Sequence, residues 1–179
     1  MRAIKKGALK SAAFGLLFAA MLPACAMAGE IPFPNVPNPK QDPQLSYDGF
    51  FKHHQPVKLL FAVGQPGPQL KESLINSALV IRYLKAHGYR YRIHMVLYSR
   101  AVFVADQFDQ KYSGWAPLLT ALHKQGVTFS VCHNAMALLH VKEGDIYPFM
   151  KVIPAGILSV AEYEMKGYHP IFNPNTETE

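Results

Sequence analysis

Cysteine is scarce in this chain of 179 residues, which contains only Cys25 and Cys132. Two cysteines cannot build the disulfide framework of a small secreted domain. Cys25 lies in a segment that we expect to be removed or lipidated on export, so Cys132 is expected to be the only free thiol of the mature chain. Cys132 then has four possible roles: a buried inert thiol, an intermolecular link, a metal ligand or a reactive group.

Several signatures of common function classes are missing as well. The stretch "GQPGPQ" at 64–69 has neither the Gly-Lys-Ser/Thr ending of a P-loop nor the spacing of a dinucleotide fingerprint. We expect a single domain, and the sequence shows no internal repeat beyond the alternation of strands and helices described below. Of the 18 basic residues, four precede residue 29, which leaves 14 against 12 acidic residues and a mature charge of about +2. This charge indicates no nucleic-acid partner.

The N-terminus has the pattern of a secretory signal peptide. Basic residues precede an apolar segment at 12–22, which is too short to span a bilayer. Ala26-Met27-Ala28 has the form cut by signal peptidase, so we expect a signal peptide at 1–28, a periplasmic or secreted chain from Gly29, and no transmembrane segment after cleavage. The alternative is a lipoprotein with Cys25 lipidated, although the proline in "LPAC" is unusual. The basic residues are Arg2, Lys5, Lys6 and Lys10.

The next segment, 29–56, is rich in proline and is predicted to be an extended leader without helix or strand. Its residues Phe33, Phe50 and Phe51 either dock on the domain or a neighbouring subunit, or belong to a loose spacer. The chain is expected to end in a polar tail at 174–179.

Between these segments, 57–173 alternates between apolar strands and amphipathic helices. This alternation predicts one three-layer α/β/α domain of flavodoxin-like type, with a mostly parallel sheet of about five strands. Pro170 places the last strand at a sheet edge. The expected strands are 57–63, 91–98, 127–131, 150–156 and 168–172, and the expected helices are 70–87, 115–126, 134–141 and 157–166.

Ligands of open α/β sheets bind at the carboxyl ends of the strands, where the segments 64–69, 99–114, 132–136 and 154–156 are expected to meet. Cys132 lies there between a strand and a helix. Backbone N–H groups and the helix dipole at such a position favour a nucleophilic sulfur. His133 is expected to add positive charge, and Asn134 to cap the helix or donate a hydrogen bond.

Competing readings remain open from the residues alone. A buried structural thiol is one, since cysteine is often buried. Cys132, His133 and Met136 together form a soft ligand set that suits Cu(I) or haem iron, although Met136 also suits a core position. His94 is interpreted as a satisfied histidine inside a strand, and the loop carboxylates Asp106 and Asp109 as an exposed polar face.

Two stretches of the C-terminal half carry a family resemblance: "GVTFSVCHNAMALL" and "GDIYPFMKVIPAGILSVAEYEMKGYHPI". Both resemble the DsrE/DsrF-like sulfur-relay family, specifically its exported single-domain members. The resemblance covers roughly 57–172. It implies a flavodoxin-like domain that forms a homo-oligomer, a trimer or hexamer, and a cysteine that carries sulfur as a persulfide without a cofactor. That role falls on Cys132, but the family's Cys-Gly-Asn-Thr appears here as Cys132-His133-Asn134-Ala135.

The resemblance therefore implies a periplasmic sulfur carrier or sulfurtransferase-like relay, with Cys132, His133 and Asn134 at its site. Its partners would be sulfur donor and acceptor proteins or small sulfur species. Two alternatives stay open. One is a copper- or haem-binding module that uses Cys132, His133 and Met136, and the other is a non-catalytic oligomeric scaffold that binds a partner protein.

Overall fold

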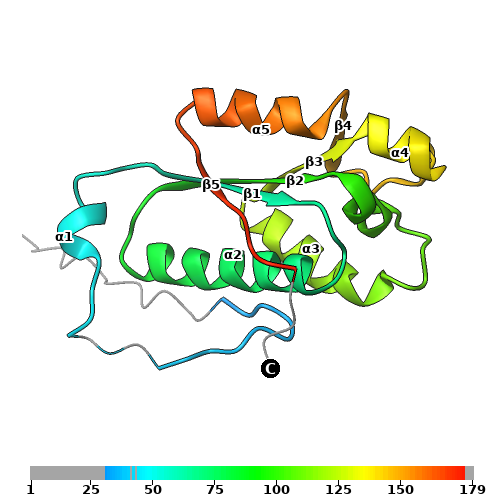
Figure 1. The fold of residues 1–179 in the computed structure, drawn as a ribbon. Helices are drawn as coiled ribbons and strands as arrows, with labels where there is room; N and C mark the ends of the chain where they lie inside the picture. The colour runs from blue at the N-terminus through cyan, green and yellow to red at the C-terminus, as the bar shows by residue number, and fades with distance from the viewer. Residues whose placement is uncertain (1–30, 41, 43, 176–179) are drawn as a thin grey trace, which may run out of the picture.

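A computed structural model describes residues 31–40, 42 and 44–175 as a five-stranded sheet flanked by helices (Figure 1). The sheet order is β4-β3-β2-β1-β5, and all four strand pairs are parallel. The predicted three-layer, flavodoxin-like α/β/α class is thereby confirmed. The expected signal peptide, its cleavage site and Cys25 lie outside the described residues, as does the end of the tail.

The strands agree closely with the sequence pattern because their buried runs are apolar on both faces. β1 pairs with the central strand β2 along its whole length, and β5 pairs with the other side of β1. β5 is thus an edge strand, as Pro170 predicts. The fourth strand ends at Ile153, before the expected end at 156. The bounds are β1 Val57–Val63, β2 Tyr91–Leu97, β3 Thr128–Cys132, β4 Met150–Ile153 and β5 His169–Ile171.

The helices α2 (Pro68–Ala86) and α3 (Ala116–Lys124) lie on one side of the sheet, and α5 (Gly156–Met165) lies on the other (Figure 1). α2 is followed by Gly88, whose φ of +70° lies in the left-handed region that favours glycine. This turn reverses the chain from α2 into β2. Among the described residues, no helix combines the length and the apolar character needed to cross a bilayer.

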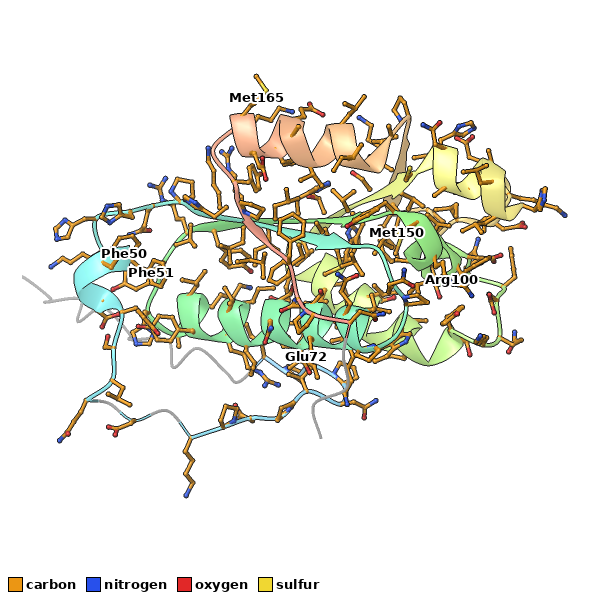
Figure 2. All side chains as sticks on the ribbon, viewed as in Figure 1. Phe50, Phe51, Glu72, Arg100, Met150 and Met165 are labelled. Atoms are coloured by element: carbon orange, nitrogen blue, oxygen red, sulfur yellow. The ribbon has the colours of Figure 1, made fainter. Side chains whose placement is uncertain are left out.

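Two clusters of buried side chains hold the layers together, and Figure 2 shows side chains on both faces of the sheet. The larger cluster includes side chains from β1, α2 and α3, such as Phe61, Leu74 and Leu119. The smaller cluster comprises the buried residues Leu60, Ala62, Val96 and Val160, from β1, β2 and α5. Met165, the last residue of α5, is 90% exposed (Figure 2).

The leader is docked on the domain and not loose. Phe33 and Val36 are buried in the larger cluster. The prediction of a leader without helix is wrong near the C-terminal end of the leader. There α1 (Asp48–Phe51) forms one helical turn. Phe51 packs edge-on against the ring of Tyr83 in α2, whereas Phe50 is 56% exposed.

Short helices replace the long loop expected at 99–114. The segment η1 (Ser99–Ala105) is a 3-10 helix that follows β2, and η2 (Ser113–Trp115) leads into α3. α4 (His133–Leu139) follows β3 without a linker, and η3 (Glu143–Asp145) precedes β4. η1 packs against α4, so these two segments form the carboxyl edge of the sheet next to Cys132.

Candidate functional site

Cys132 is the last residue of β3 and the N-cap residue of α4. This is the predicted strand-to-helix junction at the carboxyl edge of the sheet. Within the described residues it is the only cysteine, and its thiol is free. Its side chain makes no capping hydrogen bond to α4, so the sulfur is not committed to the helix that follows it.

The Cys132 side chain is largely covered, with 6% of the residue exposed. The start of α5 forms part of this cover, because a Cβ atom on Gly156 would lie 3.3 Å from the Cβ of Cys132. The positive end of a second helix therefore begins beside the thiol, in addition to that of α4. The sequence pattern indicated only the α4 terminus, since the approach of α5 depends on how the crossover after β4 packs.

Tyr98 is a second component of the site that the sequence analysis did not identify. It follows β2 and is next in register to Cys132, because Leu97 pairs with Val131 one residue earlier. Its ring lies over Gly64 at the end of β1, where a Cβ would lie 3.2 Å from the ring carbons. The residue after it, Ser99, has a φ of +48°, a left-handed conformation that is uncommon for serine. A tyrosine at the end of an apolar strand, followed by a polar residue, is the sequence signal that could have identified it.

The two residues that follow Cys132, His133 and Asn134, are both exposed in the first turn of α4. The expectation that Asn134 caps this helix is wrong, because Cys132 occupies the N-cap position. The backbone N–H of Asn134 donates a hydrogen bond to the Pro154 carbonyl at 3.2 Å. This bond ties α4 to the turn between β4 and α5, so that one of the first-turn amides is not free for the sulfur.

The proposed soft ligand set is not assembled. Met136 is 2% exposed and packs in the larger core cluster, while His133 points into solvent. No group of three or more His, Cys, Asp or Glu side chains suitable for a metal ion occurs in the described part of the chain. Met136 therefore has the core role that its helical position allowed.

The loop "GQPGPQ" after β1 has its amides occupied by a side chain. The Oε1 atom of Gln69 accepts hydrogen bonds from the N–H groups of Gly64 at 2.8 Å and Gln65 at 2.9 Å. Gln69 also donates to the carbonyl of Asn173, which anchors the segment after β5. An internal acceptor thus takes the place that a phosphate would occupy in a phosphate-binding loop.

His94 lies on the sheet beneath α5 and makes two side-chain hydrogen bonds. Its Nδ1 is 2.7 Å from the Thr128 hydroxyl and its Nε2 is 2.8 Å from the Ser130 hydroxyl. The ring stacks on Tyr163 of α5 with centroids 3.8 Å apart. Burial lowers the pKa of His94 to about 4, although the nearby Glu162 raises it in part. The interpretation of His94 as a satisfied face histidine is confirmed.

The loop carboxylates Asp106 and Asp109 shape local turns. Asp106 accepts a hydrogen bond from the N–H of Phe108 at 2.8 Å, and Asp109 accepts one from the N–H of Lys111 at 2.9 Å. Both residues are partly exposed rather than fully exposed. These bonds stabilise the turn between η1 and η2 and do not bring the carboxylates to Cys132.

Comparison with known proteins agrees with this architecture. A family model described as the DsrE/DsrF-like family matches residues 58–172. A solved structure titled as a protein of unknown function, MTH1491 from Methanobacterium thermoautotrophicum, is 26% identical with a TM-score of 0.51 and covers 63% of this chain and 96% of its own. The YchN protein from E. coli is 15% identical with a TM-score of 0.48, covering 64% and 97%. No curated protein matches the sequence.

Proposed function

This chain belongs to the DsrE/DsrF-like family, and we propose that it accepts sulfane sulfur on Cys132 and passes it on. The observation that carries the proposal is the position of Cys132 at the carboxyl edge of the sheet, between the N-termini of α4 and α5. Ligands of open α/β sheets bind at this edge. Two helix N-termini attract the negative charge of a persulfide anion placed between them.

The chemistry needs no cofactor. The Cys132 thiolate attacks the outer sulfur of a donor persulfide or polysulfide, so that a new S–S bond forms on Cys132 while the donor S–S bond breaks. The donor leaves as a thiolate with the electron pair of the broken bond. An acceptor thiolate then attacks the outer sulfur of the Cys132 persulfide, and Cys132 returns to its starting state. No external oxidant or reductant is consumed in either transfer.

The covered position of Cys132 supports this role in an exported protein. An exposed thiolate in an oxidising compartment forms mixed disulfides or is oxidised further. With 6% of the residue exposed, Cys132 is shielded from bulky thiols, whereas a small inorganic polysulfide needs little space. We place the protein in the periplasm on the basis of its signal-like N-terminus, with donor and acceptor proteins or small sulfur species as partners.

His133 and Asn134 are assigned supporting roles in this proposal. Both are exposed and flank the sulfur on the α4 side. A protonated His133 would attract an anionic polysulfide, and the Asn134 amide would donate a hydrogen bond to it. Neither contacts another described side chain through a hydrogen bond, so both are available to an incoming donor.

Intact mass spectrometry tests the proposal directly. The mature chain is incubated with sodium polysulfide, and we expect a gain of the mass of one sulfur atom that is reversed by a reducing agent. The matched control is Cys132→Ala, which should show no gain while keeping its fold by circular dichroism. Wild-type protein that never gains sulfur, or a Cys132→Ala variant that gains as much, would contradict the proposal.

Export and the cleavage site are tested by cell fractionation and by sequencing the mature N-terminus. Fractionation of cells that express the full chain should place the protein in the periplasm, with a mature chain beginning at Gly29. A chain that begins at an acylated Cys25 would instead show the lipid-anchored form. A chain that keeps its N-terminal methionine and stays in the cytoplasm would refute export.

A second candidate function, an oligomeric scaffold that binds a partner protein, is favoured by a different observation. Apolar side chains near the start of α5 and in α4 are exposed: Leu138 at 79%, Ile157 at 68% and Leu158 at 69%. Such residues suit a surface between subunits or with a partner. A scaffold would keep its cellular function in the Cys132→Ala variant and lose it in an Ile157→Glu variant. A sulfur relay would instead lose its function in Cys132→Ala and keep it in Ile157→Glu.

A further inference from the structure

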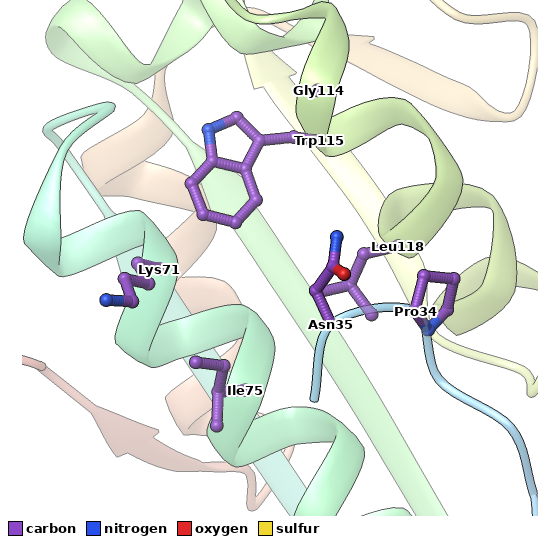
Figure 3. A pocket seen from close by; sticks show the side chains of 7 residues that line it. All are labelled: Pro34, Asn35, Lys71, Ile75, Gly114, Trp115 and Leu118. Carbon is purple, nitrogen blue, oxygen red and sulfur yellow. The ribbon is translucent and has the colours of Figure 1, made fainter. Parts of the chain in front are cut away.

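A cavity lies between α2, the start of α3 and the leader, and Cys132 is not among the residues that line it (Figure 3). Its volume is about 290 Å³, at the lower end of the range for small-molecule pockets. It lies on the side of the sheet that α2 and α3 cover. The lining residues are Pro34, Asn35, Lys71, Ile75, Gly114, Trp115 and Leu118.

The leader wall of this pocket is held in place by Arg82 of α2. The Arg82 guanidinium donates hydrogen bonds to the carbonyls of Ile31 at 3.2 Å and Pro37 at 2.7 Å. It also lies over the Phe33 ring, 5.4 Å from the centroid. Because Phe33 is itself buried, these contacts fix the leader on both sides of the residues that face the pocket.

Asn35 occupies the turn of the leader at the pocket wall. Its φ is +58°, and the N–H of Val36 donates a hydrogen bond to the Phe33 carbonyl at 3.4 Å. Asparagine tolerates this left-handed conformation better than most residues, so the turn is compatible with the amide side chain. The turn therefore places the Asn35 amide next to the apolar walls of the pocket. Among the described residues this amide has no hydrogen-bond partner.

The lining combines apolar surfaces with a few hydrogen-bond donors. Ile75, Leu118 and the indole of Trp115 form the apolar part (Figure 3). Lys71 is the one charged residue in the lining, and no acidic residue lines the cavity. Within the described part of the chain, the side chains of Lys71, Asn35 and Trp115 form no hydrogen bond or ion pair with the protein. Lys71 and Asn35 are exposed and Trp115 is partly buried, so these three donors are accessible to a ligand at the pocket.

We propose that this pocket binds a small organic carboxylate with a flat apolar body. The body packs between Ile75 and the Trp115 indole, because an apolar ring gains most from stacking on an aromatic face. The carboxylate accepts hydrogen bonds from the Lys71 ammonium and the Asn35 amide, which complement a negative charge. The cavity volume limits the body to about one or two rings.

The pocket contains a built-in probe, because Trp115 is the single tryptophan of the sequence. Its fluorescence is measured in the mature chain during titration with phenylacetate and, separately, with the uncharged phenylacetamide. We expect saturable quenching by phenylacetate with a dissociation constant in about the millimolar range, as its size implies. The amide should bind roughly three- to fivefold more weakly, because it lacks the charge pairing with a partly exposed lysine.

Four variants separate this site from general binding. Lys71→Met should weaken phenylacetate to the level of phenylacetamide, whereas Lys85→Met, a change of an exposed lysine farther along α2, should have no effect. Ile75→Phe should fill the cavity and abolish saturation, with its fold checked by circular dichroism. Cys132→Ala should bind phenylacetate as the wild type does, because the pocket does not include Cys132. The result of this test is therefore independent of whether the sulfur relay proposal is correct.

Three results would overturn the proposal. The first is no saturable change of Trp115 emission by phenylacetate in folded protein up to its solubility limit. The second is equal affinity for phenylacetate and phenylacetamide, and the third is equal affinity of Lys71→Met and wild type for phenylacetate, because the charge would then play no part. If phenylacetate leaves Trp115 emission unchanged and the molar mass measured by light scattering rises with protein concentration, the proposal is wrong. A second copy of the chain would then occupy this face.

Discussion

Gly156 and Tyr98 are in contact at a distance that allows no side chain on the glycine. A Cβ built on Gly156 would lie 2.6 Å from the Cβ of Tyr98, which is closer than real Cβ contacts. The same atom would lie 3.3 Å from the Cβ of Cys132. The first residue of α5 therefore packs directly on the ends of β2 and β3, and this contact closes the site over the thiol.

Gly156→Ala is expected to destabilise the protein by about 1–3 kcal/mol, because the added methyl group forces α5 away from Tyr98. Urea unfolding followed by circular dichroism measures the change. The matched control is Gly144→Ala, since a Cβ at Gly144 would meet nothing within 4 Å. Equal stability of Gly156→Ala and wild type would show that α5 does not pack as described.

The covered Cys132 predicts slow and size-dependent thiol labelling. We expect a bulky maleimide to react at least about tenfold more slowly with the folded chain than with the urea-unfolded chain, because 6% of the residue is exposed. A small methanethiosulfonate reagent should show a smaller difference. Gly156→Ala should raise the rate with maleimide. Equal rates in folded and unfolded protein would contradict the described cover.

His94 predicts a loss of stability in acid. Its pKa is lowered from 6.5 to about 4 in the folded state, so the unfolded state binds more protons between these two values. The free energy of unfolding should therefore be highest above pH 6.5 and fall by about 3 kcal/mol as the pH drops to about 4. Urea unfolding across this pH range measures the slope.

The matching variant for this pH dependence is His94→Gln, which cannot take up the proton. Its unfolding free energy should vary less between pH 6.5 and about 4 than that of the wild type. The control His53→Gln, at an exposed position, should keep the wild-type slope. An unchanged slope in His94→Gln would assign the acid sensitivity to other groups.

Arg82 is predicted to anchor the leader. Arg82→Met removes the hydrogen bonds to Ile31 and Pro37 and should cost about 1–2 kcal/mol of stability. Limited proteolysis should then cut the leader faster at 31–40 than in the wild type. Arg92→Met, at an exposed position of β2, serves as the control. If the protease cuts the leader of Arg82→Met no faster than that of the wild type, the anchoring role of Arg82 is refuted.

Much of the fold could be read from periodicity, because apolar runs and helical spacing are local properties. The strand Val57–Val63 and the position of Cys132 at the end of β3 were predicted to within a residue. The edge position of β5 followed from Pro170, which cannot donate a hydrogen bond to a neighbour. α1 was missed because one helical turn after a proline-rich segment has no periodic signal.

The sequence by itself determined the fold class, the strand and helix alternation, the single free thiol of the domain and its place at the carboxyl edge. These depend on residue types and short spacings. Only the tertiary structure decided what surrounds the thiol: the contact of Gly156 with Tyr98, the separation of Met136 from His133, and the pocket that the leader completes with Trp115. Such contacts join residues far apart in the chain, and their geometry follows from how the layers pack, which no local pattern encodes.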